Sequence, residues 1–163
     1  MLHPVDKGGK IRTYEMLKQL KREHHVTYLT LDDGTAPPDA HEQASEYCHK
    51  LVTIPHRLRE KFSAGFYLEL FENLFSRLPY AVNKYESPAM RREIQRLVEQ
   101  DKPDVVVCDF LTPSVNVPEN LGCATALFQH NVEAMIWQRH YETQTNPLKR
   151  LYLYGQWLKM RAL

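Results

Sequence analysis

Short apolar runs alternate along the chain with longer segments in which apolar residues recur every three or four positions. The short runs are rich in β-branched residues and end at polar residues or proline, which predicts strands at 26–31, 51–54, 104–109 and 124–128. The run at 104–109 holds three consecutive valines, so we expect burial on both of its faces, as in a parallel sheet.

The periodic segments predict helices that bury one face each. One follows the polar turn at 6–10, a short one covers 40–47, and a longer one runs from about 59 to 77. Ser87 and Pro88 supply the N-cap and first position of another, Asn131 caps one that starts at 132, and the last begins near 147. Alternating helices and strands predict an α/β sandwich with right-handed crossovers.

An aromatic and aliphatic stripe marks the helix predicted at 59–77. Such a stripe is more typical of a face that packs into the core than of a lipid site. The other interpretation is a weak peripheral contact with a membrane, aided by nearby cations. The stripe comprises Phe62, Phe66, Tyr67, Leu70, Phe71, Leu74, Phe75 and Leu78, and the cations are Arg57, Arg59 and Lys61.

Composition narrows the functional classes. The chain has 163 residues and a net charge of +1, so we expect one domain and no overall field that favours nucleic-acid binding. Its three cysteines form no metal-type spacing, and Cys108 and Cys123 lie in apolar runs, which indicates free thiols in a reducing compartment. No apolar run approaches membrane-spanning length and no signal peptide is present, so we expect a cytoplasmic protein without a bound metal.

Polar residues cluster where two predicted strands end. His130 follows the strand at 124–128 and precedes a helix, the position where α/β folds bind ligands. Its side chain would donate a hydrogen bond to a ligand hydroxyl or to developing charge, or else be a buried histidine satisfied by backbone. Asp109 ends a strand at the same sheet edge, so it would meet a ligand hydroxyl or order its own loop with Thr112. Glu133 would stabilise the helix N-terminus.

A second candidate site lies near the N-terminus, at Gly8 and Gly9. The two glycines leave room for close approach and for positive φ, and the helix that follows favours a phosphate at its N-terminus. Lys10 and Arg12 add positive charge within one turn. The alternative interpretation of the two glycines is a turn that only reverses the chain. Asp32, at the end of the next predicted strand, we interpret as an ordinary turn residue.

Both ends of the chain lack an expected neighbour. A glycine-rich turn that opens a helix normally follows a strand, but only residues 1–5 precede this one. The last helix reaches the C-terminus without a capping glycine. We therefore expect a Rossmann-like three-layer sandwich with a mainly parallel sheet, truncated at both ends.

Two segments resemble known motifs. Residues 8–13, GGKIRT, resemble the G-G-x-x-R loop of family 4 retaining glycosyltransferases, and residues 128–137, FQHNVEAMIW, resemble the histidine loop of that family. The order and separation of the two segments also match. The chain 1–163 thus looks like the N-terminal, acceptor-side half of a GT-B enzyme, similar to bacterial enzymes that build surface polysaccharide or glycolipid.

The resemblance implies specific roles and partners. Such enzymes transfer a sugar from a nucleotide-sugar donor to a glycan or glycolipid acceptor, with retention and without a metal cofactor. It implies that Gly8, Gly9 and Arg12 face the donor diphosphate and that His130 lies near the transferred sugar, all lining one hollow. Asp109, Asn131 and Glu133 would bind the acceptor or order the loop. A C-terminal half would hold the nucleotide, and a lipid acceptor would bring the protein to the inner face of the cell membrane.

Two other functional classes fit the same residues. One is a non-catalytic α/β module that binds a phosphorylated ligand. The other is a small α/β hydrolase that uses His130 with Asp109.

Overall fold

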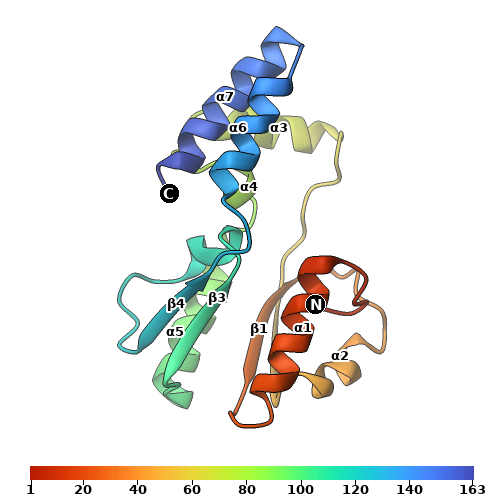
Figure 1. The fold of residues 1–163 in the computed structure, drawn as a ribbon, viewed down its shortest axis with the longest axis vertical. Coiled ribbons are helices and arrows are strands. Elements are labelled where there is room, and N and C mark those ends of the chain that lie inside the picture. The colour runs from red at the N-terminus through yellow and green to blue at the C-terminus, as the bar shows by residue number, and fades with distance from the viewer. The chain divides into compact units, whose positions relative to one another are not determined.

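The computed structural model describes residues 1–163 and comprises two compact units, Met1–Leu58 and Arg59–Leu163 (Figure 1). Both units combine helices with a parallel pair of strands, so the chain belongs to the α/β class as predicted. None of its helices is both long and apolar enough to cross a membrane.

The first unit pairs two parallel strands beside a helix. Its elements are α1 (Gly8–Leu20), β1 (Thr27–Asp32), α2 (Ala40–Gln43), the 3-10 turn η1 (Ala44–Glu46) and β2 (Lys50–Pro55). Thr27 lies opposite Lys50 and Asp32 opposite Pro55. After β1, Asp32 Oδ1 accepts a hydrogen bond from the amide of Gly34 at 3.0 Å, which confirms Asp32 as a turn residue.

An aromatic core holds this unit together. Tyr47 is fully buried, and its ring meets the edge of Tyr28 at 5.4 Å and of Tyr14 at 5.9 Å between ring centroids. Edge-to-face pairs of this kind add to the burial of apolar area. Leu2 and Cys48 complete the buried cluster, so α1 and both strands share one core.

The second unit carries the other strands and most of the helices. Its elements are α3 (Ala64–Asn73), α4 (Tyr80–Asn83), α5 (Pro88–Asp101), β3 (Val105–Asp109), η2 (Thr112–Asn116), β4 (Ala124–Phe128), α6 (Glu133–Thr143) and α7 (Pro147–Arg161). Strands β3 and β4 are parallel, with Val105 opposite Ala124 and Asp109 opposite Phe128. Helices α6 and α7 lie side by side as a hairpin (Figure 1).

Helix α5 forms as its sequence predicts. The Ser87 hydroxyl accepts a hydrogen bond from the amide of Met90 at 3.2 Å, and Pro88 occupies the first turn. Met90, Ile94 and Leu97 are buried, at the helical spacing that puts them on one face. The capping signal and the apolar spacing therefore fix both the start and the inward face of this helix.

Three local predictions are wrong. The helix expected at 59–77 spans only Ala64–Asn73, and its aromatic stripe is largely exposed instead of packed into the core. Val105 and Val107 are each 50% exposed, so β3 is not buried on both faces in this chain. The glycines expected in a turn before α1 instead form its first turn. In each case the sequence pattern predicted that the helix or strand exists, but not its bounds or its exposure to solvent.

The predicted single sheet is not observed. The strands form two separate two-stranded sheets, β1 with β2 and β3 with β4. Each strand therefore has one edge without a strand partner, the arrangement that invites further pairing.

Candidate functional site

The carboxyl ends of β3 and β4 bring Asp109 and His130 together. Asp109 is the last residue of β3, and His130 follows the end of β4 by two residues. The amide of Phe110 donates to the carbonyl of Phe128 at 3.0 Å, which extends the pairing past the last registered residues. Because parallel strands end at one edge, residues 21 apart in sequence meet there, as the sequence predicted.

A short hydrogen bond joins the two side chains. Nε2 of His130 lies 2.7 Å from Oδ1 of Asp109, and the side chains are 11% and 19% exposed. A carboxylate can only accept a hydrogen bond, so the proton of this bond lies on Nε2. Asp109 thereby fixes both the tautomer and the orientation of the imidazole ring.

Two phenylalanine rings hold the imidazole from different sides. Phe110 stacks on it with 3.8 Å between ring centroids and 9° between planes, and Phe128 meets it edge-on at 5.4 Å. Phe110 has a φ of 76°, in the left-handed region that bulky side chains rarely adopt. Strained residues of this kind cluster at functional sites, where the surrounding structure enforces them.

Cys108 lies immediately beneath this site. Its thiol donates to the carbonyl of Phe110 at 3.4 Å, and burial raises the pKa of Cys108 to about 11. A thiol with so high a pKa stays protonated at neutral pH, whereas the thiolate is the reactive form. Cys108 is therefore mostly protonated at neutral pH, and its thiol contributes a hydrogen bond to the loop.

The start of α6 differs from the prediction. Val132, and not Asn131, occupies the N-cap position, and no side chain caps the helix there. Asn131, which follows His130 in the sequence, is exposed. Glu133 is the first residue of α6, where a carboxylate interacts favourably with the helix dipole. The expected cap at Asn131 is wrong because the helix begins one residue later.

Gly8, Gly9 and Arg12 lie in the other unit, at the beginning of α1. Lys7 occupies the N-cap position without a side-chain cap, and a Cβ at Gly8 would meet no heavy atom within 4 Å. Neither glycine has a positive φ, so what Gly8 provides is open space and not a special backbone conformation. Since these residues and His130 belong to different units, their shared hollow stays a prediction.

Sequence reasoning missed Phe110 altogether. It found Asp109 and His130 from the polar residues at strand ends, but no local signal marks a phenylalanine that must adopt a left-handed φ. In the structure, no group of three or more His, Cys, Asp or Glu side chains is arranged to hold a metal ion. No protein-family model, curated protein or solved structure matches the chain.

Proposed function

We propose that the chain is the acceptor-side half of a GT-B glycosyltransferase similar to the retaining enzymes of family 4. The enzyme would transfer a sugar from a nucleotide-sugar donor to the hydroxyl of a glycan or glycolipid, without a metal cofactor. One observation carries the proposal: at the carboxyl ends of two parallel strands, Asp109 holds His130, and His130 belongs to the segment that resembles the histidine loop of that family.

His130 is the proposed polar group beside the transferred sugar. An imidazole held by a carboxylate and stacked on Phe110 keeps one orientation, so it costs little reorganisation when charge develops nearby. Asp109 is the positioning residue for this ring and supports any positive charge that the ring acquires.

Gly8 and Gly9 are the proposed donor-facing loop. The open space at Gly8 and the start of a 13-residue helix suit a diphosphate, and Arg12 adds a cation one turn further on. A C-terminal half would bind the nucleotide, so we expect the chain alone to transfer little sugar.

The proposal extends to the fold. A Rossmann-like sandwich with a continuous parallel sheet would need at least one further strand, and the unpaired strand edges are consistent with that requirement. Coding DNA upstream of Met1 would then encode an apolar strand in frame, and DNA downstream of Leu163 a nucleotide-binding domain. The site would face the cytoplasm, where nucleotide sugars are available.

The test uses the longest open reading frame that contains this chain. It would be incubated with labelled UDP-, GDP- and dTDP-sugars and with lipid-extracted acceptors, and sugar transfer would be counted. We expect turnover that falls about 100-fold or more in His130→Ala, the usual range for a lost acid–base or polar catalytic group. His140→Ala is the matched control, because His140 is exposed on α6 and its ring meets that of Trp137.

Two outcomes would contradict this function. Equal transfer by the His130→Ala and His140→Ala proteins would remove His130 from the chemistry. Hydrolysis of simple esters or phosphoesters by the chain alone, abolished by His130→Ala, would instead support a hydrolase built on the same Asp–His pair.

A further inference from the structure

A histidine side chain closes the N-terminal end of the β1–β2 strand pair. Nδ1 of His49 accepts a hydrogen bond from the amide of Val26 at 3.2 Å. The carbonyl of Val26 accepts from the amides of His49 at 2.8 Å and of Lys50 at 3.2 Å. Both backbone polar groups of Val26 are thereby held next to the first registered pair of the strands, Thr27 with Lys50.

The contact between His49 and Val26 requires a neutral imidazole. A ring nitrogen accepts a hydrogen bond only while it carries no proton, so the neutral ring of His49 has its proton on Nε2. Once Nδ1 is protonated, two N–H donors face each other and the hydrogen bond is lost. The end of the strand pair is therefore closed in one charge state of His49 only.

A second histidine makes this end of the strand pair more sensitive to acid. The ring of His25 stacks on that of His49, with 4.9 Å between ring centroids and 17° between planes. Both residues are exposed, so protons reach them directly from solvent. Because histidine is the side chain that ordinarily changes charge between pH 5 and pH 8, acid would place two positive charges within this stack.

The surroundings give His49 no carboxylate to offset a positive charge. The charged groups that act on its ring are His25 and, from the turn after α1, Lys21. Glu46, the one acid of η1, instead accepts a hydrogen bond from the hydroxyl of Tyr14. Desolvation, followed by the charges of His25 and Lys21, lowers the pKa of His49 below its ordinary value of 6.5. The stability that this contact supplies is therefore complete above pH 6.5 and is lost as the pH falls through the lowered pKa.

The sequence neighbours of His49 do not reverse this balance. Cys48 is buried, and burial raises the pKa of its thiol, so the thiol stays neutral in acid. Lys50 adds a further cation on the other side. Acid therefore accumulates positive charge at this end of the strand pair.

We propose that His49 and His25 form a pH-sensitive latch on the β1–β2 pair, closed at neutral pH and open in acid. Val26 packs against the buried cluster that includes Tyr47 and Cys48, so opening the latch would loosen the core of the first unit from one end. The latch goes beyond sugar transfer, and its test needs neither donor nor acceptor.

Nuclear magnetic resonance of the full chain tests the latch between about pH 8 and about pH 5. Long-range proton–nitrogen spectra report which ring nitrogen is protonated, and we expect Nε2 for His49 at the higher pH. We expect His49 to titrate at lower pH than in the urea-unfolded chain. As it titrates, the Val26 amide should lose about threefold to fivefold of its protection from hydrogen exchange, after correction for the intrinsic pH dependence, because one exposed hydrogen bond is lost.

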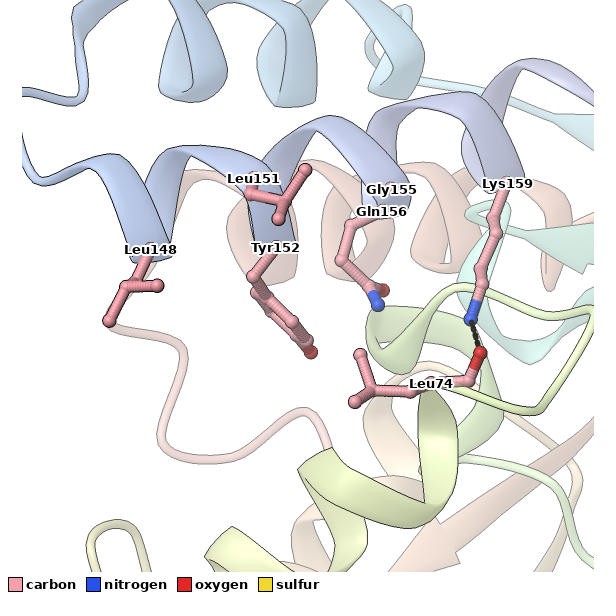
Figure 2. A pocket seen from close by; sticks show the side chains of 7 residues that line it. All are labelled: Leu74, Leu148, Leu151, Tyr152, Gly155, Gln156 and Lys159. Carbon is pink, nitrogen blue, oxygen red and sulfur yellow. Dashed lines mark hydrogen bonds between the residues drawn. The ribbon is translucent and has the colours of Figure 1, made fainter.

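Helix α7 provides an internal reference in every sample. Figure 2 shows the hollow that Tyr152, Gln156 and Lys159 of this helix line. The helix contains no histidine, Asp or Glu, and burial raises the pKa of Tyr152 to about 12. We therefore expect the backbone amide of Gln156 to keep its protection over the same pH range.

Two variants separate the hydrogen bond from the charge. In His49→Asn, the side-chain oxygen can accept from Val26 but does not titrate, so Val26 should keep its protection in acid. In His49→Leu, no acceptor remains, so the protection of Val26 should be low at every pH. His49 is exposed, so both variants should fold, and circular dichroism would confirm it. The matched control is His24→Asn, because His24 is also exposed in the turn before β1, and this variant should open in acid as the unmodified chain does.

Three results would overturn the latch. The first is a proton on Nδ1 of His49 at the higher pH, and the second is protection of Val26 that stays constant while His49 titrates. The third is an equal loss of protection in His49→Asn and in the unmodified chain, which would assign the acid sensitivity to groups elsewhere.

Discussion

Two polar pairs in the second unit have similar hydrogen-bond lengths and opposite surroundings. Gln156 Nε2 donates to Asn73 Oδ1 at 2.9 Å, and both residues are 1% exposed. The remaining polar atoms of these amides also have partners: Tyr80 N donates to Gln156 Oε1, and Asn73 Nδ2 donates to Leu78 O. This pair is closed to solvent and satisfied, so it joins α3, α4 and α7.

The Asp109–His130 pair lies instead at a sheet edge that solvent reaches. Its side chains retain 11% and 19% exposure, and the ring rests on Phe110 in a strained conformation. Buried amides that satisfy one another stabilise a fold, whereas a titratable pair kept accessible beside backbone strain is suited to chemistry. The comparison therefore separates a structural pair from the proposed functional pair by the surroundings of each pair and not by bond length.

The largest expected effect comes from breaking the structural pair. Gln156→Leu removes the partners of the buried Asn73 Oδ1 and of the part-buried amide of Tyr80. Polar groups that are buried without a partner have lost their hydrogen bonds to water and gained none in return. We therefore expect the free energy of unfolding to fall by about 2–4 kcal/mol. Urea unfolding followed by circular dichroism measures this.

The matched control for that variant is Gln138→Leu. Gln138 donates to Glu142 at 2.8 Å in an exposed pair on α6, which should contribute less than about 0.5 kcal/mol. If both substitutions cost the same, the buried amides do not stabilise the helix packing as we argue.

The next effect concerns the thiol of Cys108, in the strand that ends at Asp109. Since burial raises the pKa of Cys108 from 9.0 to about 11, its thiolate fraction at pH 8 is small. Allowing for the greater nucleophilicity of a more basic thiolate, alkylation by iodoacetamide should be about tenfold slower than for the unfolded chain. Mass spectrometry of Cys108 peptides with and without urea gives the ratio. A native rate equal to the unfolded rate would mean that solvent reaches the strand beneath the pair.

Local signals predicted the elements that depend on local chemistry. The Ser87-Pro88 cap, the four strands and the meeting of Asp109 with His130 were all predicted, because caps, β-branched runs and parallel strand ends are properties of short segments. The α/β class followed from their alternation.

What the sequence could not predict depends on partners distant in the chain. The stripe on α3 was evident, but its direction is set by the amide of Asn73, which Gln156 binds from 83 residues away. The left-handed φ of Phe110 is likewise imposed by its surroundings, namely the hydrogen bond from its amide to the carbonyl of Phe128 and the stack on His130. Hydrophobic periodicity defines a face, and tertiary contacts decide whether that face points inward.

The smallest expected effect tests the strain at Phe110. Phe110→Ala removes the stack on His130 and keeps a side chain in the left-handed region, whereas Phe110→Gly removes the stack and relieves the strain. We therefore expect the glycine variant to be more stable than the alanine variant by about 1 kcal/mol, the reverse of the order in helices. Phe62 provides the comparison, since it has a φ of 67° and is 77% exposed, and its replacement by glycine should cost nothing or stabilise the protein. If alanine at 110 were as stable as glycine, the backbone there would be relaxed, and the proposed functional pair, Asp109–His130, would lose the feature that most distinguishes it from Asn73–Gln156.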